Sequence, residues 1–517
     1  MCNTYRLGVI VALSALIVGS LMSAVAAQAP TQGGVLTIAD TYTWNELDPQ
    51  KASGQNDFRV LSLAFEGLTA KTGTLEIVPC LAESWEISED GLVYTFHLRE
   101  NVAFQNGRIM TMEDVLFSFD RMLNPETAST RLSLFQDTIQ SYRALDSNTL
   151  EIALGSPFSP FLAEMANRTP IIAPESVDSS NELMEWIGTG PFKLVEWTRG
   201  ESLYFESHDQ YWIEGVPYVD AVRVILMTDE TARLAALRTG EIDYMVDFNA
   251  KDVATARSGG FGEMTVMQAN DPHWYWMYIN TRDPQGPLAD VRVRQAIAYA
   301  IDKDDYVAAM TFGTGVPSNQ AYPPGSFWYL DVEDPYRDAD LDKARELLAA
   351  AGYPEGFSTN LVVASQFRMD LQAEILQSQL SKVGIEVEIE AYDWAGAMEH
   401  WRNYDYGLSV MVWVAQADPD TSYNPWVTDA GLTWAAGGYS SDLYDAILAR
   451  AAQAVDPAAR RAFYELALLH LQEQVPSVIQ MISNDYRAVG ARVKGAEDCL
   501  NIFAYSGGGV AYLWLED

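Results

Sequence analysis

Two hydrophobic periods alternate along the chain, one typical of strands and one typical of helices. Apolar and polar residues alternate over residues 85–88 and again over 94–98, on either side of an Asp90-Gly91 turn. This predicts a β-hairpin, because alternate strand positions face the same side of a sheet. Thr111, with Asp114 three residues later, resembles a capping box, and apolar residues at helical spacing follow it. We expect a helix with one buried face there.

The second half of the chain repeats this alternation. Residues 361–363 form an apolar run, a helical stripe ends at Gly384, and apolar residues then alternate with glutamates over 385–390. Strand, helix and strand in this order predict a β-α-β unit with parallel strands. Asp290 is placed to cap another helix, and Gly352 to end one. The whole pattern indicates the α/β class.

No fixed-period repeat and no Gly/Ser- or Pro-rich linker divides the chain. A chain of this length is expected to form two or three domains. Without a linker, the chain must cross between the domains several times, and we expect short strands to act as hinges at these crossings.

The N-terminal residues predict export. Arg6 precedes an apolar run from Leu7 to Val18, and a tract of small residues follows over 23–29. This is the layout of a secretory signal peptide, assigned to residues 1–28, because the apolar core is shorter than the ~20 residues that span a membrane. An uncleaved anchor over residues 7–27 is the alternative. No later segment of spanning length lacks charges.

Charge and cysteine content narrow the possible partners. The sequence has 71 acidic and 33 basic residues, which makes nucleic acid and anionic lipid poor partners. Beyond the signal peptide the cysteines are Cys80 and Cys499. In an oxidising compartment they are a candidate disulfide, with two separate buried thiols as the alternative.

No motif of catalysis or cofactor binding stands out. The chain has no HExxH, no GxSxG and no Walker-type loop. Asp338, Asp340 and Asp342 resemble the start of a calcium loop, but Lys343 and Ala349 replace its Gly and Glu. We therefore predict no metal site, no cofactor and no catalytic residue. With 14 tryptophans and many carboxylates, a glycoside hydrolase is the strongest enzymatic alternative.

A series of ordered motifs resembles one family of importer proteins, the dipeptide-, oligopeptide- and nickel-binding family of solute-binding proteins. The longest block joins the predicted hairpin to the predicted capped helix. The matching segments are Leu81-Ala82-Glu83-Ser84-Trp85, Asp90-Gly91, residues 94–99, Thr111-Met112-Glu113-Asp114-Val115, Gly188-Thr189-Gly190-Pro191-Phe192, residues 237–243, 291–297, 343–348 and Asp418-Pro419-Asp420. They extend over nearly the whole mature chain.

The resemblance implies a two-lobe periplasmic-binding-protein fold of the class II type, with an extra domain inserted in the first lobe. It places lobe I at residues 30–75, 190–270 and 490–517, the inserted domain at 76–189 and lobe II at 271–489. Cys80 and Cys499 would then both lie in or beside lobe I, which favours the disulfide.

The resemblance also implies a function. The protein would be a periplasmic monomer that closes on a peptide-like, opine-like or oligosaccharide solute and delivers it to a cognate ABC permease and ATPase. A signalling or chaperone-like role on the same fold is the alternative, because fold alone does not determine function.

Candidate ligand-binding residues follow from the same resemblance. Peptide-binding members pair the ligand ammonium with an acidic residue shortly after a tryptophan of the second lobe; here Trp413 is that tryptophan and Gln416 takes the acidic place. Arg368 precedes a second-lobe helix, where some members bind a ligand carboxylate. Aromatic residues near predicted strand ends can line the cleft or pack in the core. The full candidate set is Tyr42, Trp44, Arg368, Trp413, Gln416, Asp418 and Trp434.

Overall fold

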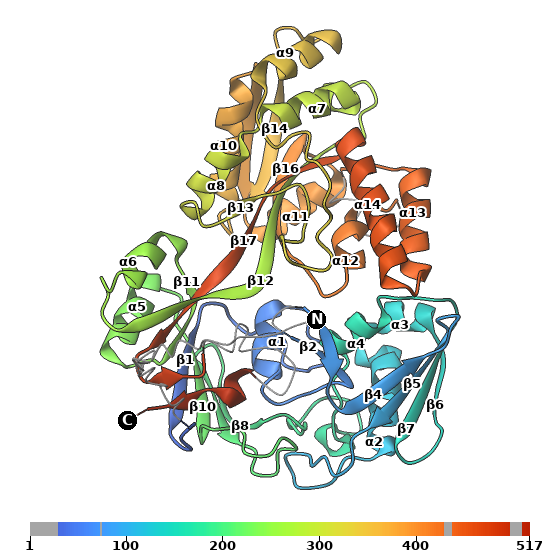
Figure 1. Ribbon diagram of the computed structural model, residues 1–517, viewed down its shortest axis with the longest axis vertical. Helices are drawn as coiled ribbons and strands as arrows, with labels where there is room; N and C mark the ends of the chain where they lie inside the picture. Colours follow the sequence, from blue (N-terminus) through green and yellow to red (C-terminus); the bar gives the residue numbers. More distant parts are fainter. Residues whose placement is uncertain (1–28, 73–74, 429–436, 497–508, 517) are drawn as a thin grey trace, which may run out of the picture.

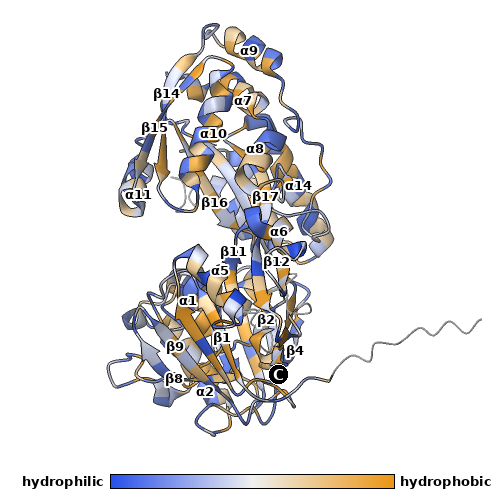
Figure 2. Ribbon diagram, turned by 90° about the vertical axis from the view of Figure 1, so that its left-hand side faces the viewer, coloured by the Kyte–Doolittle hydropathy of each residue, from blue (hydrophilic) through white to orange (hydrophobic). Residues whose placement is uncertain are grey.

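The computed structural model describes residues 29–72, 75–428, 437–496 and 509–516. The predicted signal peptide, Trp434 and Cys499 lie outside these residues. Two lobes are stacked along the long axis of the molecule (Figure 1), and they meet at a narrow waist when the molecule is viewed from the side (Figure 2). In the described residues, none of the helices combines the length and the apolar character needed to cross a bilayer.

The first lobe is built on a mixed sheet. β1 is parallel to both of its neighbours, β10 and β11, and β9 and β8 continue the sheet in antiparallel pairing. Its strands are β1 (Val35–Asp40), β8 (Phe192–Thr198), β9 (Ser202–Ser207), β10 (Ala221–Leu226) and β11 (Tyr244–Phe248), with helices α1 (Gln55–Leu61), α5 (Glu230–Thr239) and α6 (Val253–Arg257). A short pair, β18 (Val493–Lys494) and β19 (Trp514–Leu515), brings the C-terminal segment back to this lobe.

The inserted domain lies beside the first lobe and has its own hydrophobic core. A four-stranded antiparallel sheet in the order β4-β5-β7-β6 packs against its helices. Its elements are β2 (Thr69–Lys71), β3 (Ile77–Pro79), β4 (Ala82–Ile87), β5 (Val93–Leu98), β6 (Ile139–Ala144), β7 (Thr149–Leu154), α2 (Met112–Leu123), α3 (Leu132–Thr138) and α4 (Phe161–Arg168). The predicted hairpin is confirmed as β4 and β5, and the capping box of Thr111 and Asp114 starts α2.

The second lobe has a parallel layer of three strands, with β14 paired to β15 on one side and to β16 on the other. Helices surround these strands, and the largest apolar cluster of the molecule fills the space between them. The elements are β13 (Val316–Pro317), β14 (Phe357–Ala364), β15 (Ile385–Tyr392), β16 (Leu408–Val414), α7 (Val291–Ala300), α8 (Lys303–Thr311), α9 (Leu341–Ala350), α10 (Met369–Ser381), α11 (Trp394–Asn403), α12 (Asp420–Tyr423), α13 (Asp442–Gln453) and α14 (Pro457–Gln474).

The predicted elements of the second lobe are confirmed. β14, α10 and β15 form the expected parallel β-α-β unit, although β14 begins at Phe357, four residues before the predicted run. The earlier residues also pair with β15, but Ser358, Thr359 and Asn360 are polar and interrupt the apolar run after Phe357. Asp290 caps α7, and Asp340 caps α9, so the aspartates that resemble a calcium loop belong to a helix N-terminus.

Two antiparallel strands, β12 (Met264–Ile279) and β17 (Ser477–Gly490), pass through both lobes. The expectation of short hinge strands is wrong: these have 16 and 14 residues, because each is a sheet strand in both lobes. Their pairing shifts register at the crossing, where residues 269–271 of β12 lie opposite Asp485 of β17. Such an irregularity interrupts the ladder and bends the strands, which makes the crossing the natural hinge.

Candidate functional site

The parallel strands of both lobes end at the waist. β16 is antiparallel to β12, and its last residue, Val414, pairs with His273 next to the crossing. β11 is antiparallel to β17, and its last residue, Phe248, pairs with Tyr486 on the other side of the crossing. The carboxyl ends of the two sets of parallel strands therefore face one another. In open α/β sheets ligands bind outside these ends.

On the first lobe, charged side chains gather at the ends of β1 and β11. Asp40 ends β1 and is fully buried, and Asp247 lies near the end of β11 with a positive φ of 55°. Arg59 of α1 lies between them, 3.3 Å from Asp40 and 3.8 Å from Asp247. Burial lowers the pKa of Arg59, but Asp247 and Asp40 raise it above its ordinary value, so the guanidinium stays charged.

Tyr42 follows this group on the loop after β1, with 42% of its surface exposed. Desolvation, with the carboxylates of Asp247 and Asp485, raises the pKa of Tyr42 to about 12. Its hydroxyl therefore keeps its proton at neutral pH and can donate a hydrogen bond.

On the second lobe, the loop between β14 and α10 carries Phe367 and Arg368. Both residues have positive φ, 52° and 59°, a strained conformation for side chains of this size. Phe367 is 49% exposed, and Arg368 is also exposed, with its guanidinium 6.0 Å from the ring of Phe312. Arg368 is also close enough to Tyr275 of β12 to lower the pKa of that phenol, although burial makes the net shift upward.

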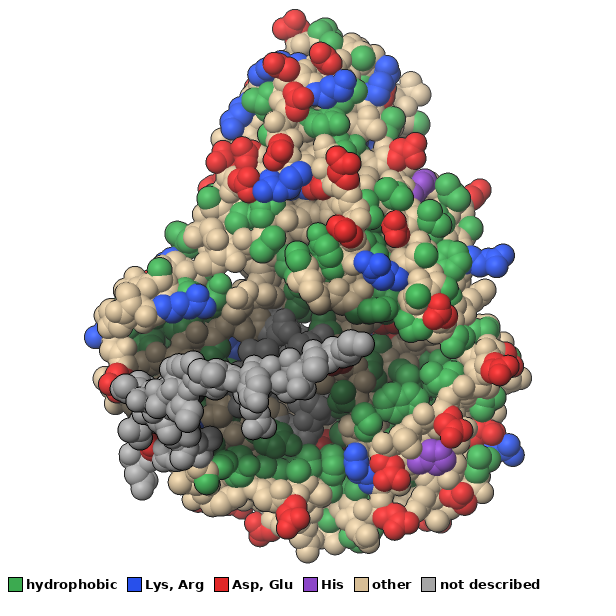
Figure 3. All heavy atoms as spheres, viewed as in Figure 1, with side chains coloured by type: hydrophobic (Ala, Val, Ile, Leu, Met, Phe, Trp, Pro, Cys, Tyr) green, Lys and Arg blue, Asp and Glu red, His purple; other side chains and the backbone are tan. Residues whose placement is uncertain are grey.

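The two lobes touch through aromatic rings. The ring of Tyr42 lies 6.0 Å from the ring of Phe367, which in turn lies 6.2 Å from that of Trp394. We call Asp40, Tyr42, Arg59, Asp247, Phe367, Arg368 and Asp485 the strand-end cluster. It combines cationic, anionic and aromatic groups between two bodies, and the surface is hollowed between these bodies (Figure 3). Such a set can orient a small polar molecule and enclose it.

Two other candidate residues of the second lobe, Trp413 and Gln416, lie on or just after β16. The half-buried Trp413 packs against Trp274 and Trp276, at ring distances of 6.0 and 5.8 Å, within the second-lobe core. Gln416 donates from its amide to the carbonyl of Val414 at 3.1 Å. Both lie on or just after β16, so the structure brings them to the same edge of the sheet as Arg368.

Asp418 has a partner of its own. Its two carboxylate oxygens accept hydrogen bonds from Arg460 at 2.6 and 2.8 Å, and the two side chains are only 9% and 5% exposed. Trp44 is likewise turned inward: it is 8% exposed, belongs to the first-lobe core, and donates from its indole to Asp40 at 3.4 Å. Both residues thus serve packing or charge balance in this structure.

The remaining candidates involve residues outside the described chain. Trp434 is one of these. Cys80 is buried in the core of the inserted domain, but its predicted partner, Cys499, is outside the described residues, so the disulfide stays a prediction.

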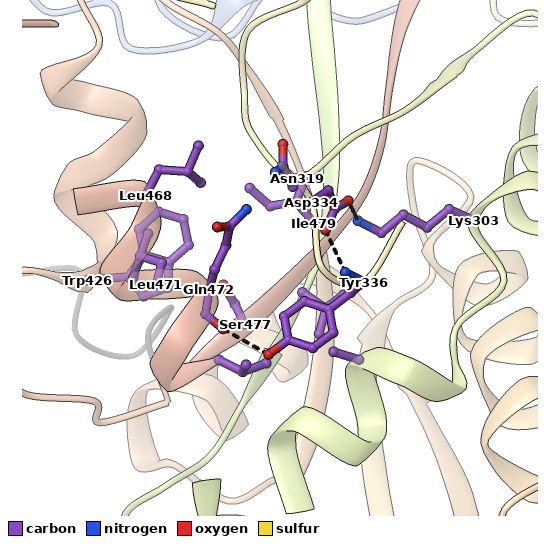
Figure 4. A pocket seen from close by; sticks show the side chains of 13 residues that line it. Lys303, Asn319, Asp334, Tyr336, Trp426, Leu468, Leu471, Gln472, Ser477 and Ile479 are labelled. Carbon is purple, nitrogen blue, oxygen red and sulfur yellow. Dashed lines mark hydrogen bonds and ion pairs between the residues drawn. The ribbon is translucent and has the colours of Figure 1, made fainter. Parts of the chain in front are cut away.

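A small pocket inside the second lobe is separate from the strand-end cluster (Figure 4). Lys303 donates to Asp334 at 2.6 Å and to the carbonyl of Ser318 at 2.8 Å, and the Tyr336 hydroxyl donates to the carbonyl of Gln472 at 2.9 Å. The cavity measures about 40 Å³, enough for one or two water molecules. Lys303, Asp334 and Tyr336 are paired, whereas the amide nitrogen of Asn319 and the indole nitrogen of Trp426 are buried without a hydrogen-bond partner. A pocket of this size suits water rather than a solute. Among the described residues, no three or more His, Cys, Asp or Glu side chains are arranged to hold a metal ion.

Sequence reasoning missed five members of the strand-end cluster: Asp40, Arg59, Asp247, Phe367 and Asp485. Asp247 had a usable signal, because an acidic residue directly follows the buried run of Tyr244, Met245 and Val246. A carboxylate at the end of an apolar strand is unusual unless it has a partner or a function. Asp485 had no such signal, since its neighbours give no sign that β17 crosses between lobes.

The fold and the paired strand ends define a class, that of two-lobed solute-binding proteins. The comparisons with known proteins agree. Residues 76–434 match the family described as bacterial extracellular solute-binding proteins, family 5 Middle. The Escherichia coli dipeptide-binding protein is 30% identical over 458 residues, covering 82% of this chain and 84% of that protein. Heme-binding protein A of Haemophilus influenzae is 29% identical and covers 82% of each chain.

Solved structures show the same likeness. The periplasmic binding protein DppA of Helicobacter pylori, in complex with the peptide STSA, has a TM-score of 0.79 at 29% identity and covers 94% of this chain and 99% of its own. AgaA of A. tumefaciens R10, in complex with agropinic acid, has a TM-score of 0.76 at 28% identity, with the same coverage. The chain belongs to family 5 of the bacterial extracellular solute-binding proteins. It is the substrate-binding component of an ABC transporter, in a family of extracytoplasmic binding proteins rather than enzymes.

Proposed function

We propose that this protein captures a carboxylate-bearing solute of peptide-like or opine-like chemistry in the periplasm and passes it, chemically unaltered, to its cognate permease and ATPase. Removal of residues 1–28 as a signal peptide would release it into that compartment. It acts as a monomer, because one chain supplies both faces of the strand-end cluster.

The exposed position of Arg368 is the observation from which we infer a carboxylate-bearing ligand. Its guanidinium is exposed at the carboxyl ends of the second-lobe strands, in a strained loop whose neighbouring ring reaches Tyr42 of the other lobe. A planar guanidinium binds a carboxylate through two parallel hydrogen bonds. Strained backbone is commonly retained where it positions a functional side chain.

The other side chains complete the proposed site. Tyr42 and Phe367 offer aromatic surface to the apolar part of the ligand, and Gln416 offers an uncharged amide. Trp413 and Trp434 would complete the walls. Two relatives, 29% and 28% identical to this chain, bind a peptide and agropinic acid, and both ligands carry carboxylates.

An oligosaccharide is the second candidate, because exposed aromatic rings also stack on the apolar faces of sugars. Tyr42, Phe312 and Phe367 are all more than two-fifths exposed. A sugar would leave Arg368 without a carboxylate, and this separates the two candidates.

The working cycle follows from the hinge. We propose that residues 30–75, 190–270 and 490–517 move as one lobe, with the inserted domain of residues 76–189, and that residues 271–489 move as the other. Rotation at the register shift of β12 and β17 opens and closes the strand-end cluster. A ligand stabilises the closed state only by its differential affinity for that state, so contacts to both lobes are required.

Calorimetric titration tests the proposal with defined compounds: a panel of dipeptides, glutathione, agropinic acid and a malto-oligosaccharide. We expect a carboxylate-bearing compound to bind, and Arg368→Ala to weaken that binding while Arg368→Lys retains part of it. Binding of the neutral sugar alone, unaffected by Arg368→Ala, would replace the first candidate with the second. Chemical turnover of any bound compound would overturn both.

A further inference from the structure

A second cavity separates the inserted domain from the second lobe, away from the hinge. It has a volume of about 600 Å³. One wall comes from β4, β5, α4 and the segment around Ile77; the other comes from residues 325–328, the loop after β16 and the start of α14. None of Tyr42, Phe367 and Arg368 lines it, so it is separate from the strand-end cluster.

The two bodies touch directly at the rim of this cavity. The backbone N–H of Ser159 donates to the carbonyl of Ala452 at 2.8 Å, and its hydroxyl donates to the carbonyl of Ala454 at 2.5 Å. Gly91 lies so close to Val455 that a β-carbon at Gly91 would be 2.7 Å from the Val455 methyl. The cavity is therefore enclosed only while the inserted domain and the second lobe are in contact.

The walls are mainly apolar. Ile87, Leu162, Phe327 and Trp328 are among the apolar side chains of the lining, and Phe327 is 58% exposed. Phe327 thus presents an accessible aromatic surface that a guest in the cavity can contact. The volume is within the range of pockets that hold small organic ligands.

The charged groups of the cavity floor are already satisfied by one another. Asp418 and Arg460 form the two-hydrogen-bond ion pair described above, and Arg460 also donates to the carbonyl of Ala451 at 3.0 Å and to the hydroxyl of Tyr464 at 3.1 Å. The Trp328 indole donates to the carbonyl of Ala417 at 3.2 Å. Glu76, the third charged residue of the lining, is exposed, so water screens its charge. An anionic guest would lose its hydration here without gaining a free cationic partner, whereas an uncharged guest gains apolar contact.

We propose that this cavity is a second binding pocket, for an uncharged aromatic or aliphatic group of a small molecule. Because its walls belong to two bodies, its occupant contacts both and stabilises the closed arrangement of the lobes. The pocket goes beyond the carboxylate-binding function proposed for the strand-end cluster and does not depend on it.

The test uses the neutral fluorescent probe N-phenyl-1-naphthylamine, which brightens in apolar surroundings, with the full mature protein. We expect saturable binding of one probe per chain. Phe327→Ala should weaken it about three- to tenfold by removing apolar contact. Ile87→Trp should weaken it about tenfold or more by filling the space. Both positions are exposed enough that the variants should fold, which thermal melting verifies.

Two controls separate this pocket from other apolar surfaces. Leu443→Ala removes a side chain that is 60% exposed on α13 and does not line the cavity, and Phe367→Ala alters the strand-end cluster. Leu443→Ala should not change probe affinity, Phe367→Ala should change it less than either pocket variant does, and Ile87→Trp should leave binding of a carboxylate-bearing solute unchanged. Absence of saturable binding would overturn the proposal, and so would an unchanged affinity in both pocket variants or an equal loss in Phe367→Ala.

Discussion

The two lobes meet at two places that differ in chemistry. At the hinge side, the strand-end cluster presents charged and aromatic groups in strained loops, with Arg368 exposed. At the side of the inserted domain, Asp418 and Arg460 form an ion pair with each other, and the remaining walls are mainly apolar. If both proposals hold, one pair of bodies has a site for polar recognition and another for shape and apolar contact.

The backbone explains part of this difference. Parallel strands bring several polar loop residues to one edge, because each strand ends beside the next. The inserted domain offers antiparallel strands and a helix, and along β5 buried side chains alternate with partly buried ones. Variants that alter one meeting place and spare the other test this contrast.

The largest effect is expected from Arg460→Ala. The substitution leaves the buried carboxylate of Asp418 without its partner and should reduce the free energy of unfolding by about 3–5 kcal/mol. Urea denaturation measures this. Arg337→Ala is the matched control, because its partner Asp304 is 67% exposed and the loss should stay below about 1 kcal/mol. Equal losses in the two variants would show that the pair at the cavity floor is not a buried one.

A comparable effect that depends on pH is expected at Glu66, which joins the first lobe to the inserted domain. This buried carboxylate accepts hydrogen bonds from Thr189, Tyr211 and Trp212 at 2.8–3.0 Å. Burial raises its pKa to about 7 from an ordinary value of 4.5. Between pH 4.5 and 7 the folded state therefore binds more protons than the unfolded state, so stability falls as pH rises, by about 3 kcal/mol in all.

Glu66→Gln should remove this contribution to the slope between pH 4.5 and 7, whatever its effect at a single pH. Urea denaturation at several pH values measures it. Burial and Asp418 raise the pKa of Asp420 to about 7 as well, so part of the slope should persist, and Asp420→Asn should remove that part. An unchanged slope in Glu66→Gln would contradict the assignment.

Arg368→Ala should affect binding and leave folding unchanged. Loss of a charge-assisted hydrogen-bonded pair is expected to weaken binding of a carboxylate-bearing solute about ten- to hundredfold. Because Arg368 is exposed, the free energy of unfolding should change by less than about 0.5 kcal/mol. Titration and denaturation of the same preparation separate the two effects. If affinity is unaffected, Arg368 does not contact the ligand.

Trp413→Ala should also weaken binding without unfolding the protein. The half-buried ring supports the second-lobe edge through Trp274 and Trp276, so some stability should be lost together with affinity. Calorimetric titration of the folded variant measures the effect on binding, and an unchanged affinity would remove Trp413 from the site.

The smallest effect is expected for the contact between Tyr42 and Phe367. A double-mutant cycle with alanine at both positions should show a coupling of about 0.5–1.5 kcal/mol in ligand affinity, since the rings meet across the lobes. The cycle of Tyr42 with Leu443, which lies on the outer surface of α13, should show none. Coupling of equal size in both cycles would mean that the ring contact does not contribute to closure.

Local chemistry made much of the fold predictable from the sequence. Asp290 caps a helix, Asp90 and Gly91 turn a hairpin, and Gly384 ends a helix, because each of these depends on neighbours a few residues away. The hinge was harder to predict from the sequence. Nothing local shows that β12 and β17 continue through two lobes, because that depends on pairing between residues some 200 positions apart.

The site was predictable only in part, for the same reason. Tyr42 lies after the first strand and Arg368 lies in the loop before a second-lobe helix, where the sequence and the family resemblance placed them. Asp418 appeared equally suitable in sequence, but Arg460, 42 positions away, neutralises it. Trp44 lies on a loop, yet its side chain is buried in the core and its indole donates a hydrogen bond to Asp40. Partners distant in the chain decide whether a polar or aromatic residue is available to a ligand.

The central claim is that the protein encloses a small solute between its lobes and releases it unaltered. Native mass spectrometry of the mature protein, purified from its own host without denaturation, tests this most directly. We expect one small-molecule adduct per chain. Its mass after denaturing release should equal the mass difference between the complex and the stripped protein, and it should bind again to the stripped protein. A released molecule of altered mass, or one that no longer binds, would contradict it.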